Sequence, residues 1–190
     1  MRIFFAFIML LIVSGCTGLP EGVTPVGGFD VNKYMGKWFE IARLDHSFER
    51  GMDRVTAEYS LRDDGGVKVI NRGFSIEDNK WEEAEGKAYF VRGEQEGHLK
   101  VSFFGPFYGT YAVFEIDEEN YQYAFVSGPD TSYLWLLART PTVSEAVITR
   151  FIEKSKGLGF DTDELIFVRQ EKMSELVEPK MKYTYNRVKF

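Results

Sequence analysis

Turn-forming residues recur at short, regular intervals between Gly36 and Arg139, and this spacing constrains the fold more than any other feature of the sequence. The clearest turn is Asp63-Asp64-Gly65-Gly66, because Asp-Gly accepts the positive φ angles of a tight hairpin. The segments between the turns show no helical period. They therefore predict eight antiparallel strands, in an up-and-down barrel or a sandwich. The expected strands are 36–44, 54–62, 67–76, 81–92, 98–104, 110–116, 121–127 and 133–139.

A single amphipathic helix is expected after these strands, over residues 143–156. Thr142 and Glu145 have the spacing of a capping box, which marks a helix start. Gly157 tolerates the left-handed conformation that commonly ends a helix. A short ninth strand is expected at 164–169. The apolar stripe of the helix comprises Val143, Val147, Ile148, Phe151 and Ile152.

The first strand is apolar on both faces, so both faces should be covered. Strict alternation places Trp38, Glu40 and Ala42 on one face, inside a barrel. It places Phe39 and Ile41 on the other face, where they are the natural surface for the helix to cover.

The strand at 81–92 favours a ligand cavity, because its inward residues are mostly small while its other face is charged. An eight-stranded barrel with small inward residues has room for one small ligand. The alternative is a solid core, filled by large residues such as Leu99 from opposite strands. The candidate ligand-contacting residues are Ala84, Gly86, Ala88, Phe90, Val101 and Phe103.

The mouth of such a barrel would be formed by the loops near 45–53, 77–80, 105–109 and 128–132. Three aromatic residues on these loops, Phe48, Phe107 and Tyr108, are candidate mouth residues. Exposed aromatic side chains there would guide ligand entry or touch a membrane or a second protomer. The alternative is that they are unrelated surface aromatics.

The N-terminus has the features of an export signal. Arg2 precedes an apolar run, Ile3–Val13, which is too short for the ~20 residues of a spanning helix. Val13-Ser14-Gly15-Cys16 then resembles the lipobox of bacterial lipoproteins, which implies cleavage after Gly15 and acylation of Cys16. Several acyl chains on one residue make a stable membrane anchor. The alternative is a plain secretory signal that happens to contain a cysteine.

These features divide the chain into four parts. Residues 1–15 are the expected lipoprotein signal peptide, and residues 16–29 a lipidated N-terminus with a flexible, Gly- and Pro-containing tether. Residues 30–170 form the folded domain. Residues 171–190 are an extension of unknown role.

The residue after the cysteine, Thr17, is not the aspartate that favours inner-membrane retention, which points to the outer membrane.

Charge and cysteine content narrow the function further. The formal net charge of −6 argues against a nucleic-acid partner, whose phosphates need a basic surface. The single cysteine, used as an anchor, leaves no intramolecular disulfide.

No catalytic motif, metal-ligand spacing or cofactor-binding loop occurs in the sequence, so we expect no enzyme activity, no metal and no cofactor. The two histidines, His46 and His98, are expected at the surface. Glu40 is the one inward carboxylate that needs a buried partner, which either Arg43 or Arg139 could supply.

The strand pattern, helix and two motifs together resemble the lipocalin family over Phe29–Gln170. Gly36-Lys37-Trp38-Phe39-Glu40-Ile41-Ala42-Arg43 matches the first family motif, and Leu134-Trp135-Leu136-Leu137-Ala138-Arg139-Thr140-Pro141 matches the third. The second motif is weaker, since Glu119-Asn120-Tyr121 retains only the tyrosine. The resemblance implies that Arg139 lies over Trp38 and closes the base of an eight-stranded antiparallel up-and-down barrel.

With its lipobox, the chain is most similar to the lipid-anchored outer-membrane lipocalins of bacteria, and also to apolipoprotein D. The resemblance implies that a fatty acid or lysophospholipid is bound in the barrel, for storage or transport at the cell envelope. Two alternatives stay open: an interaction protein with a filled barrel, and a lipid-modifying enzyme. A homodimer is also open.

Overall fold

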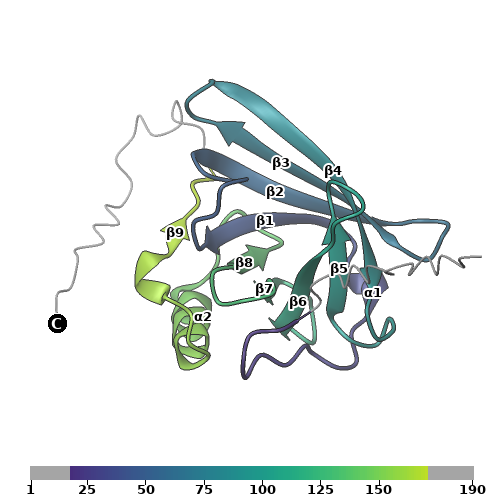
Figure 1. Ribbon diagram of the computed structural model, residues 1–190. Helices are drawn as coiled ribbons and strands as arrows, with labels where there is room; N and C mark the ends of the chain where they lie inside the picture. The colour runs from purple at the N-terminus through teal and green to yellow at the C-terminus, as the bar shows by residue number, and fades with distance from the viewer. Residues whose placement is uncertain (1–17, 171–190) are drawn as a thin grey trace, which may run out of the picture.

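The computed structural model describes residues 18–170, which form an antiparallel barrel (Figure 1). Strand β1 pairs with both β2 and β8, and this pairing closes the eight-stranded sheet on itself, while β9 adds to β1 as an extra strand. The prediction of a barrel, rather than a sandwich, is confirmed, and each predicted strand is found within two residues of its expected ends. The strands are β1 (Gly36–Arg43), β2 (Met52–Leu61), β3 (Val67–Ser75), β4 (Lys80–Phe90), β5 (His98–Ser102), β6 (Gly109–Ile116), β7 (Tyr123–Ser127), β8 (Leu134–Ala138) and β9 (Ile166–Phe167).

Because successive strands run in opposite directions, alternate loops gather at the same end of the barrel. We call one end the mouth, formed by the loops at 44–51, 76–79, 103–108 and 128–133. The other end is the floor, where the short helix α1 (Val31–Tyr34) precedes β1 (Figure 1).

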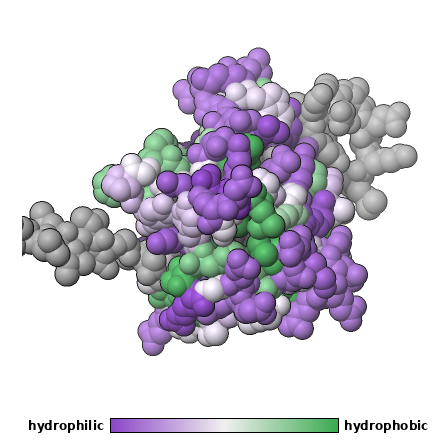
Figure 2. Space-filling model, turned by 90° about the vertical axis from the view of Figure 1, so that its right-hand side faces the viewer, coloured by the Kyte–Doolittle hydropathy of each residue, from purple (hydrophilic) through white to green (hydrophobic). Residues whose placement is uncertain are grey.

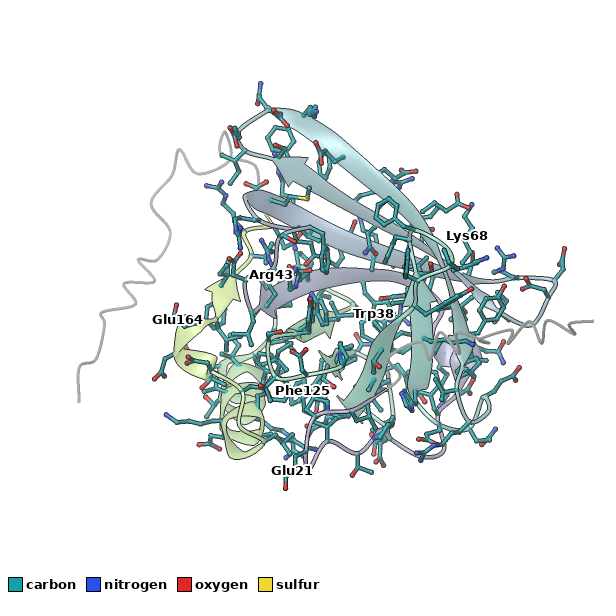
Figure 3. The ribbon with its side chains drawn as sticks, viewed as in Figure 1. Glu21, Trp38, Arg43, Lys68, Phe125 and Glu164 are labelled. Atoms are coloured by element: carbon teal, nitrogen blue, oxygen red, sulfur yellow. The ribbon has the colours of Figure 1, made fainter. Side chains whose placement is uncertain are left out.

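A β-bulge interrupts the pairing of β1 with β8 between Glu40 and Ala42. One extra residue in a strand reverses the facing of every residue beyond it. Ala42 therefore lies in the outer apolar cluster, so the prediction that it shares the inner face with Trp38 is wrong. Arg43 is turned inward instead, and Figure 3 shows Trp38 and Arg43 along β1 within the barrel.

Helix α2 (Glu145–Gly157) confirms the predicted helix, but both of its ends differ from the prediction. Its N-cap is Ser144, whose hydroxyl accepts a hydrogen bond from the Val147 amide, rather than Thr142. Gly157 is the last helical residue, and the left-handed conformation is taken by Gly159 at φ 84°. Ser144 and Gly159 had the same chemistry as the residues predicted, two positions further along the chain.

Helix α2 covers the outer face of the barrel beside β1, β7 and β8 (Figure 1). Phe151 is fully buried against Phe125, with ring centres 5.0 Å apart. Phe39 and Ile41 belong to the same outer cluster, as predicted. This second core supports the β1 wall from outside and leaves the inner side free to line a cavity.

The described part of the expected tether, residues 18–29, packs on the barrel instead of standing away from it. The Val26 amide donates to the Val113 carbonyl at 2.8 Å, and the Gly97 amide donates to the Val26 carbonyl at 2.9 Å. Val23 and Phe29 are buried. The glycines and prolines of this segment therefore shape an irregular but fixed path, and the expectation of a flexible tether is wrong for these residues.

Short segments after α2 complete the described chain. The 3-10 helix η1 (Thr162–Glu164) leads into β9, and Gln170 then donates to the carbonyls of Glu40 and Val55. Glu164 lies at the periphery in Figure 3, as do Glu21 and Lys68. On the face seen in Figure 2, hydrophilic side chains dominate the edges and hydrophobic ones gather toward the middle.

Candidate functional site

The floor of the barrel is closed by the fully buried Trp38. Its indole Nε1 donates to the Tyr34 carbonyl at 2.8 Å, which ties the start of β1 to α1. Helix α1 is itself capped by Asp30, whose carboxylate accepts from the amides of Asn32 and Lys33. A capped turn of helix thus seals the floor.

Arg139 lies over the indole, with its guanidinium carbon 3.9 Å from the ring centroid of Trp38. Its terminal nitrogens donate to the carbonyls of Lys33 at 2.6 Å and Lys37 at 3.0 Å. Gly36 begins β1 at φ 92°, a backbone conformation that residues other than glycine rarely adopt. The structure therefore brings together the three residues that the sequence assigns to the barrel base, Gly36, Trp38 and Arg139.

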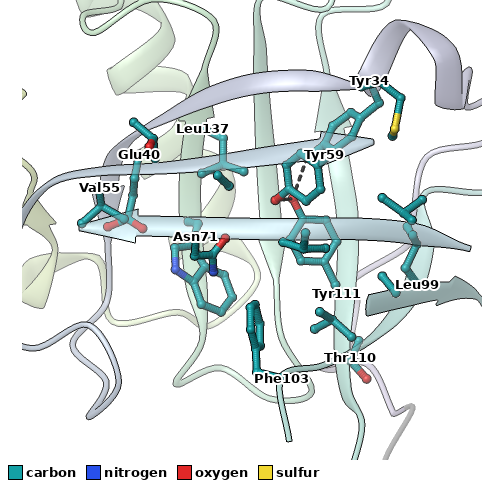
Figure 4. Close-up of a pocket in the computed structure, with 18 of the residues that line it drawn as sticks. Tyr34, Glu40, Val55, Tyr59, Asn71, Leu99, Phe103, Thr110, Tyr111 and Leu137 are labelled. Atoms are coloured by element: carbon teal, nitrogen blue, oxygen red, sulfur yellow. Dashed lines mark hydrogen bonds between the residues drawn. The ribbon is translucent and has the colours of Figure 1, made fainter. Parts of the chain in front are cut away.

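Three tyrosine hydroxyls meet above this floor (Figure 4). The Tyr111 hydroxyl lies 2.6 Å from that of Tyr34 and 2.9 Å from that of Tyr59. Burial raises the pKa of all three phenols, so they stay neutral. This tyrosine group was not predicted from the sequence, although strand alternation places Tyr59 and Tyr111 inward.

The barrel interior holds an open cavity between the tyrosines and the mouth. The empty space in this cavity measures about 870 Å3 when the part that is open to solvent is included. The centre of a water molecule can occupy about 100 Å3 of that space. A single water needs only ~10–15 Å3 by that measure, so the barrel is not solidly packed. Most of the lining side chains are apolar, among them Val55, Val67, Val69, Leu99 and Leu137.

Four of the six predicted interior residues line this cavity, namely Ala88, Phe90, Val101 and Phe103. Gly86 is buried beside Phe103, where an added Cβ would come within 2.8 Å of the ring. Ala84 shares the inward face, opposite the cavity-lining Asn71, but it is exposed. The small residues of β4 thus make room for the Phe103 ring at one point and for the cavity at another.

The predicted mouth residues have three different surroundings. Phe48 lines the cavity and is 54% exposed, so it marks the opening. Phe107 is 73% exposed and lies outside the cavity lining. Tyr108 is turned to the outer surface, near Lys100 and Tyr89.

A buried polar cluster forms the cavity wall nearest Phe48. Arg43, 1% exposed, donates through Nη1 to Glu40 Oε1 at 2.6 Å and through Nη2 to the Glu49 carbonyl at 2.8 Å. Trp135 Nε1 donates to Glu49 Oε2 at 3.2 Å. Arg43, not Arg139, is therefore the partner of Glu40.

Two buried carboxyl groups thus lie near one guanidinium in this cluster: that of Glu40 is hydrogen-bonded to Arg43, whereas that of Glu49 accepts from Trp135. Burial, and then the charge of Glu49, hold the pKa of Glu40 well above its usual range. Burial also raises the pKa of Glu49. Both carboxyls line the cavity, so its polar wall accepts hydrogen bonds readily and offers no uncommitted cation at Arg43.

The prediction that both histidines lie at the surface is wrong. His46 and His98 are 6% and 2% exposed. His46 stacks on Phe48 with ring centroids 4.2 Å apart. Neither ring has a hydrogen-bond partner among the described residues, although His46 Nε2 lies 3.4 Å from Glu49 Oε2 and His98 Nδ1 lies 3.9 Å from Glu96 Oε1.

The burial of His46 predicts a distinct pH dependence of stability. Burial, and then the charge of Arg43, lower the pKa of His46 to about 4. In the unfolded chain His46 therefore binds a proton near pH 6.5, whereas in the folded chain it stays neutral down to about pH 4. The folded state consequently loses stability as the pH falls from about 7 to 4. We expect His46→Phe, which keeps the aromatic stack, to remove about 3 kcal/mol of this loss. Urea denaturation of both proteins at a series of pH values measures it, and parallel stability curves would disprove the assignment.

Two further features bear on the site. Within residues 18–170, no three His, Cys, Asp or Glu side chains gather as metal ligands would, and no helix there is long and apolar enough to cross a membrane. Cys16 and the extension 171–190 lie outside the described residues.

Comparison with known proteins agrees with this geometry. A family model described as a lipocalin-like domain matches residues 29–170, the part of the chain that forms the barrel and its helix. The chain belongs to the lipocalin family. This lipocalin is 61% identical to the outer membrane lipoprotein Blc of Vibrio cholerae over 171 residues, which cover 90% of this chain and all of that one.

More distant lipocalins match as well. Blc of Escherichia coli K12 is 52% identical over 85% of this chain and 90% of its own length. Bovine apolipoprotein D is 36% identical over 64% of this chain and 66% of its own. Insecticyanin from the tobacco hornworm shares the fold with a TM-score of 0.64, at 23% identity, over 80% of this chain and 86% of that structure.

Proposed function

We propose that this lipocalin is anchored in the cell envelope through an acylated Cys16 and holds one single-chain lipid, a fatty acid or a lysophospholipid, for storage or transport. The observation that carries the proposal is the cavity, which has a sealed floor, apolar walls and an opening at Phe48. Transfer of apolar surface from water into such a site is worth about 25 cal/mol per Å2. The acyl chain would therefore supply most of the affinity.

The polar groups of the cavity suit an amphiphile. The tyrosine hydroxyls lie at its floor, and Glu40 lies at the opposite end (Figure 4), where it belongs to the Glu40–Arg43–Glu49 cluster near the mouth. Since Arg43 already serves two carboxyl-bearing residues, a ligand carboxylate would gain little from it. We therefore place the tail among the valines and the head group toward the mouth.

Anchoring at the outer membrane is supported by the relatives. The Vibrio cholerae and Escherichia coli proteins are named outer membrane lipoproteins, and the chain has a lipobox-like sequence before Cys16. A filled barrel acting only as a docking protein is less well supported, because the cavity is open. Binding without turnover is favoured over catalysis, because neither histidine is paired with a nucleophile.

Filling the cavity tests this function. In a chain lacking residues 1–16 and stripped of lipid, we expect a fluorescent sixteen-carbon fatty acid to bind saturably at one per chain. Ala88→Phe, pointing into the cavity, should weaken binding at least tenfold, because the ring occupies the space of the tail. Competition with lysophospholipids then identifies the preferred head group.

Lys87→Phe is the matched control, since it adds the same ring to the opposite face of β4. It should leave the affinity unchanged, and denaturation midpoints of both variants report whether the fold is intact. Equal binding by Ala88→Phe and the unmodified protein would place the ligand elsewhere and remove the proposal.

A further inference from the structure

The chain enters the barrel at a fixed point close to Cys16. The Gly18 carbonyl accepts a hydrogen bond from Thr110 Oγ1 at 2.9 Å, and Thr110 is the second residue of β6. Two residues of chain span at most ~7 Å. The acyl chains on Cys16 would therefore start close to the beginning of β6, whatever path the intervening residue takes.

The loop that leads into β6 carries two strongly exposed phenylalanines. Phe104 and Phe107 are 82% and 73% exposed, the highest values among the large apolar side chains of the described residues. Phe103, in the same loop, points into the cavity. The exposed rings thus stand at the barrel mouth, next to the point where the chain arrives from Cys16.

This region also lacks charge. No Asp, Glu, Lys or Arg occurs between Lys100 and Glu115, although 27% of the chain is charged. Burying a charged side chain in an apolar medium is costly, whereas burying a phenylalanine is favourable. The loop is therefore chemically suited to an apolar contact, in contrast to the acidic chain as a whole.

We propose that the β5–β6 loop docks on the lipid surface that holds the Cys16 anchor, so that Phe104 and Phe107 insert into the bilayer and the barrel mouth faces the membrane. A lipid could then pass between bilayer and cavity without crossing open water. This orientation rests on the acylation of Cys16 in the proposed function. A single apolar loop binds a membrane weakly, but together with the acyl chains it fixes the orientation.

Site-specific fluorescence in the full acylated chain tests the orientation. Acylation consumes the only thiol, so Phe107→Cys introduces a unique site for an environment-sensitive dye. Leu61→Cys is the matched control, because Leu61 is 53% exposed at the end of β2, on the floor side of the barrel. Both proteins are reconstituted into phosphatidylethanolamine–phosphatidylglycerol vesicles that contain a nitroxide-labelled phospholipid.

We expect the dye at position 107 to be quenched several-fold more strongly than the dye at position 61. Equal quenching at the two sites, or stronger quenching at 61, overturns the orientation. Shielding of position 107 without nitroxide quenching also overturns it, and would indicate a second protein copy on this surface. A chain that lacks the acyl mass and stays in solution overturns both the anchor and the orientation.

A second measurement separates docking from ligand binding. The double variant Phe104→Ser/Phe107→Ser should take up a fluorescent fatty acid from vesicles about tenfold more slowly, while its affinity for the same ligand in solution is unchanged. Leu61→Ser should alter neither quantity. Uptake by the double variant at the rate of the unmodified protein contradicts the docking proposal. If the unmodified protein itself has no affinity for the fatty acid in solution, the proposed function is contradicted instead.

Discussion

Replacing Arg43 by methionine is expected to lower the free energy of unfolding by about 3–5 kcal/mol at pH 7, because the change leaves buried carboxyl groups without their cation. Arg43 is 1% exposed and is bonded to Glu40 and to the backbone of the Glu49 loop. The loss should shrink toward pH 5, since burial already favours the protonated form of both glutamates. Urea denaturation at the two pH values measures the effect.

Arg50→Met is the matched control for this substitution. Arg50 pairs with Asp45 at 2.6 Å, but both side chains are largely exposed, and such solvent-screened pairs contribute little to stability. The double variant Glu40→Gln/Arg43→Met should regain part of the lost stability, because it removes both members of the closest ion pair. If Arg43→Met lowers the free energy of unfolding no more than Arg50→Met does, the bonds of Arg43 to Glu40 and to the Glu49 carbonyl do not stabilise the fold.

Trp38→Ala is the second change with a large expected effect, about 3–5 kcal/mol of unfolding free energy. The indole is fully buried between α1 and Arg139, and its removal leaves a cavity under the tyrosines. Trp38→Phe should cost less, because most of the volume stays and only the bond to the Tyr34 carbonyl is lost. Guanidinium denaturation followed by circular dichroism provides the comparison.

Trp81→Ala serves as the control for the loss of an indole. Trp81 is 55% exposed on β4, so its removal creates no buried void. A cost for Trp81→Ala that equals that of Trp38→Ala would contradict the assignment of Trp38 as the packed floor of the barrel.

The strands could be predicted because local chemistry marks their ends, whereas the closed barrel and its floor were predicted from the resemblance to a known family. Turn residues such as Gly65 mark the strand ends, and the Gly36, Trp38 and Arg139 motifs are short enough to recognise directly. The inward direction of Ala88 and Val101 follows from simple alternation. The ends of the strands and the inward direction of these side chains follow from the local sequence, without knowledge of distant contacts.

The facing of Ala42 could not be predicted, because the bulge in β1 depends on the register with β8 and has no clear local signal. The burial of His46 likewise depends on Tyr133 and Trp135, which lie at the start of the neighbouring strand β8, about 90 residues further along the chain. The path of residues 18–29 is set by bonds to Val113 and Gly97, far along the chain. These three errors therefore concern long-range contacts, whereas the ends of α2 were misplaced by two residues between neighbouring positions of the same chemistry.

The tyrosine group is a different case, since its signal was present. Alternation turns Tyr59 and Tyr111 inward on strands that are distant in sequence. Their meeting with Tyr34 depends on α1, whose four residues are too few to show helical periodicity. Polar residues on inward positions should therefore be read together across strands.

Quenching of the tryptophan fluorescence by a brominated fatty acid shows whether the ligand lies inside the barrel. The chain has three tryptophans: Trp38 at the floor, Trp135 in the cavity wall and Trp81 outside. In a Trp81→Phe variant only the two interior indoles emit. We predict saturable quenching of this variant that is complete at one ligand per chain. Binding of the fatty acid without quenching of the interior tryptophans would show that the ligand does not lie inside the barrel.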